Sequence, residues 1–444
     1  MTSTVFQKAF NEIGLSTFLS SPRDVYLIIL QRGIRLLVYG QSSLILTAFL
    51  KSLAFTDFQM GLFMTLILLG DAAGSLVLTI YADRLGRAKV LLGGSLLMVA
   101  SGLVFASSQT YIVLLLAAMV GVITPSGNEV GPFRAIEESI LAQLTERDNR
   151  STIFAWHFTL SGLAIALGNL SGGWITRALQ QHLGWTAMSA YRGIFLLYSA
   201  AGLFNSVLTM ALSVKVEIQR KSNSSAEEED GLFEMGEEED EVVEETKETT
   251  ALVFSPETKR KVWLLSALFG VDNLSAGLVP VSIIVYFFTT KFHVDEGTLG
   301  NTFFTTSFVA AISNIVAGSL ARRFGNIRTM AFTHLPSAIF LALVPLPSNF
   351  QFARAILIAV FCTTKMDMAP RTAFLASYIS AEERTAVMGI INVVKIFSQS
   401  IGPTVTGLFA SHGKIWLSFV IAGVLQASYD LAMLYFFTTA VSVS

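Results

Sequence analysis

Long apolar stretches recur along the chain and alternate with short polar segments. A helix of about 20 apolar residues is long enough to cross the hydrocarbon core of a bilayer. We predict such spans at residues 26–52, 58–81, 88–107, 110–130, 152–176, 193–214, 262–290, 299–321, 329–347, 351–379, 386–410 and 415–438. The pattern predicts an all-α membrane protein with twelve transmembrane helices.

A polar break divides these spans into two sets of six. Thirteen of the 32 acidic residues lie between Glu227 and Glu248, and few aromatic residues accompany them. Such a segment cannot bury enough apolar surface to fold alone, so we predict a disordered linker. The predicted organisation is a cytosolic segment 1–24, a six-helix bundle 25–214, the acidic linker 215–261, a second six-helix bundle 262–438 and a tail 439–444.

Composition excludes several classes of protein. Only 14% of residues are charged and 52% are hydrophobic, whereas a typical soluble domain has about 25% charged residues. A net charge of -2 argues against nucleic acid as a partner. Cys362 is the single cysteine, and neither a phosphate-binding loop nor an H-x-x-x-H metal spacing occurs. We therefore expect no cofactor, no metal and no enzymatic activity, with a lipid bilayer as the surroundings and an ion gradient as the energy source.

The distribution of Lys and Arg predicts the orientation. Eighteen of these residues fall in the loops or at the span ends on the side of the N-terminus, and six in the loops or at the span ends on the opposite side. Positive charge concentrates on the cytosolic side of membrane proteins. Both termini and the linker are therefore expected in the cytosol, and the plasma membrane is the default location.

The two sets of six spans repeat each other. The loop after span 2 reads ADRLGRAK and the loop after span 8 reads ARRFGNIR, with Gly86 and Gly325 at the same place. Spans 4 and 10 share an acid-x-small-Pro pattern, at residues 129–132 and 367–370. Three such correspondences in the same order, the third between spans 5 and 11, indicate pseudo-symmetric bundles. Transporters built from repeats usually bind solute between them.

These motifs resemble those of the major facilitator superfamily. The resemblance covers the chain apart from its ends and the linker, and it implies the superfamily's fold. Span 5 is similar to the antiporter signature G-x-x-x-G-P-x-x-G-G, with Ala164 in place of the first glycine and Asn169 in place of the proline. This similarity favours proton-linked export.

The resemblance also implies roles for two groups of residues. The basic loops would act in gating, although a basic turn that only sets topology is the alternative; their residues are Asp83, Arg84, Gly86, Arg87, Arg322, Arg323 and Gly325. Small residues of spans 5 and 11 would let helices approach closely, with plain packing as the alternative. They are Gly168, Gly172, Gly173, Gly402, Pro403 and Gly407.

Ionisable residues within spans are the main candidates for mechanism. Each costs about 2.5–3.5 kcal/mol at the bilayer centre, so it must face the bundle interior or a partner. The resemblance places spans 1, 4, 7 and 10 around a central cavity, where most of these residues fall. The proton-coupling candidates are Glu129, Asp367, Asp71 and Asp272. The substrate-cavity candidates are Arg32, Arg35, Arg134, Lys365, Arg371, Tyr39 and Asn273. A static ion pair is the alternative role for each acid.

Spacing adds four local expectations. Arg32 and Arg35 share one helix face, and Asp367 can pair with Arg371 across a kink at Pro370. Glu137 and Glu138, at the cytosolic end of span 4, are expected to be hydrated, with Arg134 within reach of either. His157 is expected to be a hydrogen-bonded structural histidine.

We therefore predict a monomeric secondary transporter that moves a small polar or charged organic solute by alternating access, with proton-coupled export. Proton-coupled or facilitative uptake of a nutrient such as a sugar or organic acid is the nearest alternative. A non-transporting membrane sensor or lipid-handling protein is the alternative from another class.

Overall fold

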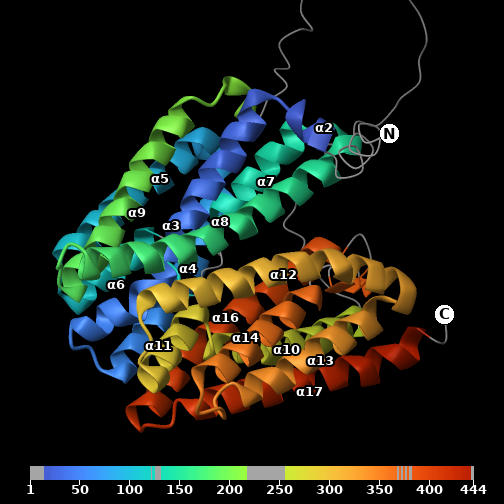
Figure 1. Ribbon diagram of the computed structural model, residues 1–444. Helices are drawn as coiled ribbons and strands as arrows, with labels where there is room; N and C mark the ends of the chain where they lie inside the picture. Colours follow the sequence, from blue (N-terminus) through green and yellow to red (C-terminus); the bar gives the residue numbers. More distant parts are fainter. Residues whose placement is uncertain are drawn as a thin grey trace, which may run out of the picture.

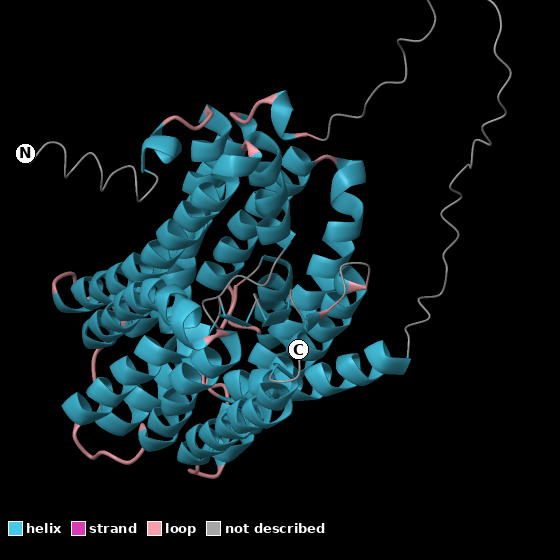
Figure 2. Cartoon of the chain, turned by 90° about the vertical axis from the view of Figure 1, so that its right-hand side faces the viewer, coloured by secondary structure: helices cyan, strands magenta, loops and turns pink. Residues whose placement is uncertain are grey.

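The computed structural model describes residues 15–121, 123–125, 132–217, 256–367, 370–371, 374–375, 378–379 and 383–441, and their regular structure is helical throughout (Figure 2). The helices before the linker are α2 (Leu15–Leu19), α3 (Arg23–Ser52), α4 (Asp57–Leu85), α5 (Arg87–Ser107), α6 (Tyr111–Gly121), α7 (Pro132–Leu144), α8 (Arg147–Gln181), α9 (Ala187–Met210) and the 3₁₀ turn η1 (Val214–Val216). Those after it are α10 (Pro256–Leu278), α11 (Val281–Phe292), α12 (Glu296–Phe324), α13 (Asn326–Leu343), α14 (Phe350–Thr364), the 3₁₀ turn η2 (Lys365–Asp367), α16 (Arg384–Ser411) and α17 (Trp416–Val441).

The helices form two bundles that lie side by side (Figure 1). Helices α3 to α9 make up the N-terminal half, drawn blue to green, and α10 to α17 the C-terminal half, drawn yellow-green to red. We call the end of the molecule where α3 begins and α17 ends the terminal face, and the opposite end the far face. The all-helical fold expected from the sequence is confirmed.

Three predicted spans are interrupted rather than continuous. Span 4 is helical only as far as Gly121 in α6, and α7 begins after the predicted end of the span; span 7 is divided into α10 and α11, and span 10 ends its α-helix at Thr364 and passes into η2. Proline cannot donate a backbone hydrogen bond and clashes with the preceding turn. Pro132 is accordingly the first residue of α7, and Pro280 precedes the first residue of α11. Interrupted helices within a membrane occur where the backbone lines a site or is buried in protein.

Glycines join the two halves near the far face. A Cβ on Gly61 of α4 would lie 2.3 Å from the carbonyl oxygen of Pro403 of α16. A Cβ on Gly173 of α8 would lie 2.2 Å from the carbonyl oxygen of Glu296 of α12. Both helix pairs therefore touch backbone to backbone, which only glycine permits.

Polar contacts reinforce this seam. Asp57 accepts hydrogen bonds from Lys51 Nζ at 2.8 Å and from Tyr286 Oη, in the other half, at 2.7 Å. The hydroxyl of Ser282 donates to the carbonyl oxygens of Ser43 and Pro125 at 2.9 and 2.8 Å. Among described residues, the hydrogen bonds and ion pairs between the halves belong to the far-face part of the helices, so the halves are fastened at one end.

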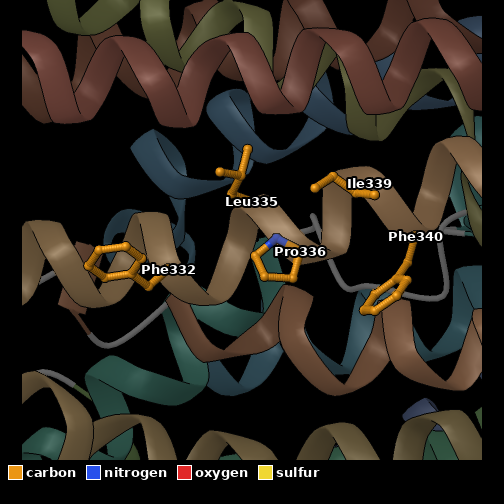
Figure 3. Close-up of a pocket in the computed structure, with 5 residues that line it drawn as sticks. All are labelled: Phe332, Leu335, Pro336, Ile339 and Phe340. Atoms are coloured by element: carbon orange, nitrogen blue, oxygen red, sulfur yellow. The ribbon is translucent and has the colours of Figure 1, made fainter.

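The exterior is apolar, as a lipid-facing surface requires. Trp263, Phe352 and Tyr435 are 79%, 69% and 76% exposed. A shallow pocket beside Pro336 of α13 is lined by apolar side chains of that helix alone (Figure 3).

By length and composition, six described helical segments could cross a membrane, while the count of twelve stays a prediction. They are Arg23–Ser52, Arg87–Ser107, Thr152–Gln181, Ala187–Met210, Glu257–Phe292 and Trp416–Phe437.

Candidate functional site

The N-terminal half contains a buried cluster that joins α3 to α7. Arg35 Nη2 lies 2.9 Å from both carboxylate oxygens of Glu137, and Arg32 Nη1 lies 3.1 Å from Oε2. Arg32 Nε also donates to Ser161 Oγ of α8 at 2.7 Å. The guanidinium of Arg35 lies 4.4 Å from the ring of Phe133. Both arginines lie on one face of α3, as their spacing predicted, and both bind the same acid, Glu137.

The expectation that Glu137 is hydrated is wrong. Its side chain is 0% exposed, because α7 turns it inward onto the two arginines. Glu138, one residue on, is 29% exposed and accepts a 2.7 Å hydrogen bond from Arg134 Nε. Arg134 is itself 48% exposed and lies 5.4 Å from the ring of Phe158. Glu137 was missed as a site residue because its partners lie about a hundred residues away in sequence.

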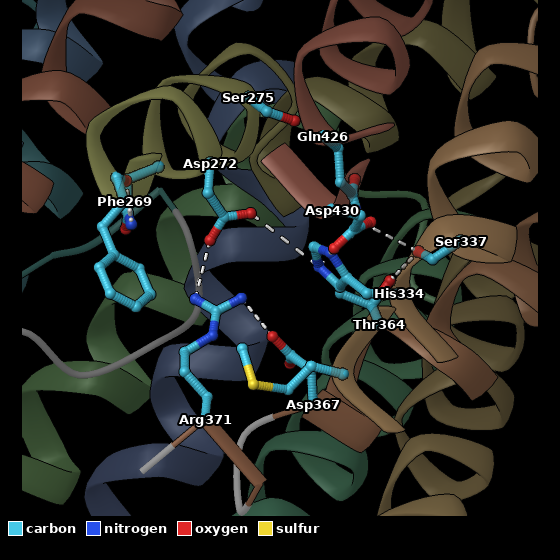
Figure 4. Close-up of polar contacts among 12 residues, drawn as sticks. Phe269, Asp272, Ser275, His334, Ser337, Thr364, Asp367, Arg371, Gln426 and Asp430 are labelled. Atoms are coloured by element: carbon cyan, nitrogen blue, oxygen red, sulfur yellow. Dashed lines mark hydrogen bonds and ion pairs between the residues drawn. The ribbon is translucent and has the colours of Figure 1, made fainter. Parts of the chain in front are cut away.

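The C-terminal half contains a second cluster with the signs of charge exchanged. Arg371, which follows η2, donates through Nη1 to Asp272 Oδ2 of α10 at 2.8 Å and through Nη2 to Asp367 (Figure 4). The guanidinium also lies 5.3 Å from the ring of Phe269. The Asp367–Arg371 pair expected from their spacing is present. Asp272 of α10 also binds Arg371, and no sequence pattern predicts that α10 packs beside Arg371.

A histidine extends this second cluster. His334 of α13 lies with Nδ1 3.0 Å from Asp430 Oδ1 of α17, and its Nε2 lies 4.0 Å from Asp272 Oδ1 (Figure 4). Because an ionised carboxylate can only accept, Nδ1 donates to Asp430; when the ring is neutral, Nε2 accepts from Gln426 Nε2 at 2.9 Å. His334 and Asp430 lie outside the residues that the sequence singled out, because their partnership spans 96 residues.

The other span candidates occupy varied surroundings. Asp71 of α4 is buried, and Tyr39 of α3 is buried with its ring 6.0 Å from that of Tyr198. Asn273 donates to the carbonyl oxygen of Phe269, one turn earlier in the same helix, at 2.8 Å. Lys365 is partly buried in η2. Glu129 lies outside the described residues, so its proposed role stays a prediction.

His157 differs from its expected environment. It is 0% exposed in α8, yet neither ring nitrogen has a hydrogen-bond partner within the described chain. Its ring packs edge-on against Phe158 at 5.5 Å, so apolar packing holds it rather than a polar network. The expected hydrogen-bonded histidine is therefore not what the structure contains.

The two basic loops adopt matching backbone conformations. Gly86 has φ 95° and caps the start of α5, and Gly325 has φ 81° and caps the start of α13. Only glycine takes this conformation readily, which accounts for its position in both copies. The side chains of Asp83, Arg84 and Arg322 lie outside the described residues. Arg323 is exposed.

A residue that the sequence did not single out holds the first of these loops. Glu217, just after η1, accepts hydrogen bonds from the backbone N–H groups of Arg87 and Ala88 at 2.8 and 3.1 Å. The side chain of Gln143 bridges Arg87 Nη1 and the carbonyl oxygen of Glu217, at 2.8 and 3.0 Å. A carboxylate at a helix N-terminus is stabilised by unpaired N–H groups.

The predicted packing glycines lie at helix crossings inside and between the halves. A Cβ on Gly168 would meet the carbonyl oxygen of Leu37 at 2.0 Å, and one on Gly172 would meet Cα of Gln41 at 2.9 Å. In α16, a Cβ on Gly402 would meet the backbone of Gly277 at 2.0 Å. Gly407 faces Gly61 across the seam between the halves, beside the Pro403 contact described above.

Comparisons with known proteins agree with this architecture. The family model described as Major Facilitator Superfamily matches residues 34–281 and 265–443. An uncharacterised membrane protein of Saccharomyces cerevisiae is 34% identical over 433 residues, covering 94% of each chain. The arabinose-proton symporter of Bacillus subtilis is 26% identical over 181 residues, 38% of this chain and 37% of that protein. The crystal structure of a bacterial homologue of the iron transporter ferroportin, in an inward-facing state, aligns with a TM-score of 0.69 at 11% identity, covering 93% of this chain and 98% of that one. The chain belongs to the Major Facilitator Superfamily.

Proposed function

We propose that the protein is a secondary transporter that moves a small polar or charged organic solute by alternating access, with protons as the coupling ion. The observation that carries this proposal is the buried network of Asp272, Arg371 and Asp367, with His334 and Asp430 attached to it. Ionisable groups at such positions are expensive to bury and mark ion or substrate pathways.

The arrangement of the halves supports the alternating-access step. The polar seam holds the halves together at the far face, through contacts such as Tyr286 to Asp57 and Tyr191 to Glu296. With the terminal face in the cytosol, this arrangement corresponds to a state closed to the outside. Opening the far face would break these exposed or partly exposed polar contacts and separate the glycine crossings at Gly61 and Gly173.

The network offers a physical route for proton coupling. Arg371 is shared by two carboxylates, so a proton that neutralises either acid removes one attraction and lets the guanidinium move toward the other. His334 Nε2 lies 4.0 Å from Asp272, and Nδ1 bonds Asp430. The imidazole can therefore exchange a proton with Asp430 directly, and with Asp272 once a small movement closes the 4.0 Å gap. Glu129, at the matching repeat position to Asp367, remains a further proton-coupling candidate.

We propose export as the direction of solute movement, on the similarity of span 5 to the antiporter signature. A second candidate is proton-coupled uptake, which the partial similarity to a protein named as an arabinose-proton symporter favours. We further propose a monomer in the plasma membrane with both termini and the acidic linker in the cytosol, and the organisation of domains given above.

The test compares solutes inside and outside cells that express the wild type, Asp367→Asn or Asp367→Glu. We expect one solute to leave the wild-type cells for the medium and this movement to fall at least about tenfold with Asp367→Asn. The glutamate variant keeps a titratable acid and should retain part of the flux. Gel filtration of each variant checks that the protein is folded. The opposite direction of movement would establish uptake, and no movement in any medium would favour the non-transporting alternative.

A further inference from the structure

A lysine beside the C-terminal cluster has no acidic partner among the described residues. Lys395 of α16 is partly buried, and within the described chain no carboxylate oxygen lies within 4 Å of its ammonium. Its Nζ lies 5.8 Å from the ring of Phe269, and the guanidinium of Arg371 lies 5.3 Å from the same ring. Both cations therefore lie near the same aromatic ring.

Hydrogen-bond donors in the same place also lack acceptors. The hydroxyl of Tyr429, a residue only 1% exposed, has no hydrogen-bond partner among the described residues, and neither has Nε of Arg371. The guanidinium of Arg371 lies 5.3 Å from the ring of Tyr429, so both residues belong to the same cluster. A buried donor without an acceptor is costly, and such donors point to an acceptor that a ligand brings.

From these contacts we infer that the transported solute is an organic anion whose acidic group binds beside Lys395 and Arg371 of the C-terminal half. This inference rests on the proposed transport function and names its substrate class. Asp272 and Asp367 do not fill the place, because both already bind Arg371. The anion supplies the acceptor that Lys395 lacks.

The test measures thermal unfolding of the purified full-length chain in detergent. The probes are D-gluconate, citrate and glucose 6-phosphate, each compared with D-glucose and with sodium chloride at matched ionic strength. The proteins are the wild type, Lys395→Gln, Lys395→Arg and Lys414→Gln, the last an exposed lysine of the loop before α17. A separate arm adds anionic phosphatidylglycerol or neutral phosphatidylcholine to the micelles.

We expect at least one acidic probe to stabilise the wild type, Lys395→Arg and Lys414→Gln, and its apparent affinity to fall about tenfold or more in Lys395→Gln, as for loss of a charge-assisted hydrogen bond. Equal stabilisation of wild type and Lys395→Gln, a response to glucose alone, a response to phosphatidylglycerol alone, or no response to any probe would overturn the inference. Proton-coupled movement of a neutral solute in cells would leave the proposed function standing while this inference fails.

Discussion

The two halves carry the same kind of ion-pair cluster with opposite distributions of charge. In the N-terminal half the cations Arg32 and Arg35 stand on the first long helix, and the acid Glu137 stands beyond the break in span 4. In the C-terminal half the acid Asp272 stands on the first helix, and the cation Arg371 follows the break in span 10. Each cluster ties a long helix to the interrupted span of its own half.

The difference between the clusters lies in how completely their charges are satisfied. Both carboxylate oxygens of Glu137 are bonded by arginines, and the residue is sealed from solvent. In the other half, acids outnumber the arginine, and His334 joins two of them. A saturated cluster suits a permanent clamp, whereas one with several acids and a histidine can exchange protons. The two halves therefore share the placement of an ion-pair cluster but differ in the chemistry that its residues allow.

Removing the acid of the N-terminal cluster should have the largest effect. Glu137→Gln leaves Arg32 and Arg35 buried without a counter-charge, and breaking a buried pair in this way costs about 3–5 kcal/mol. Thermal unfolding of the purified protein should show a much lower midpoint or no folded protein at all. Glu138→Gln is the matched control, since its exposed pair contributes about 1 kcal/mol or less. Equal midpoints for the two variants would refute the clamp.

Exchanging the charges of the C-terminal cluster should separate stability from transport. Asp272→Arg alone places two cations together, whereas Asp272→Arg combined with Arg371→Asp restores the pair with the signs of the N-terminal half. A double-mutant cycle should give a coupling of about 0.5–3 kcal/mol in thermal stability. Proton-driven flux should stay lost in the double variant, because His334 then faces an arginine rather than an acid. Recovery of both stability and flux would show that the C-terminal cluster, like the N-terminal one, serves only to hold its helices together.

The sequence could predict local features and failed where distant segments meet. Hydrophobic runs gave the helical class, and the common glycine of the two loops gave their shared turn, because both depend on neighbouring residues. The Asp367–Arg371 pair could be predicted for the same reason. Glu137 was assigned to solvent because its helical position near a span end is compatible with either environment, and only the packing of α7 on α3 decides it. The His334–Asp430 contact and the Glu217 cap likewise depend on tertiary packing.

Replacing the buried histidine of each half should have an intermediate effect on stability for His334 and a small effect for His157. His334→Phe removes the hydrogen-bond partner of buried Asp430, which should cost about 1–3 kcal/mol, with proton-driven flux reduced as well. His157→Phe should change stability by about 1 kcal/mol or less in either direction, because no hydrogen bond of the imidazole is lost and the new ring suits its aromatic neighbours.

Measuring unfolding midpoints and flux for both histidine variants makes the comparison between halves quantitative. Both residues are buried and each lies beside a charged cluster, so burial alone predicts equal sensitivity. The structure predicts unequal sensitivity, because the ring of His334 is hydrogen-bonded to Asp430, whereas that of His157 has no hydrogen-bond partner within the described chain. If His157→Phe abolishes flux while the protein remains folded, the N-terminal half takes part in proton transfer, and the division into a clamp and a proton-exchanging cluster is wrong. If flux persists in His157→Phe and falls in His334→Phe, the groups that gain and lose protons during the transport cycle lie in the C-terminal half.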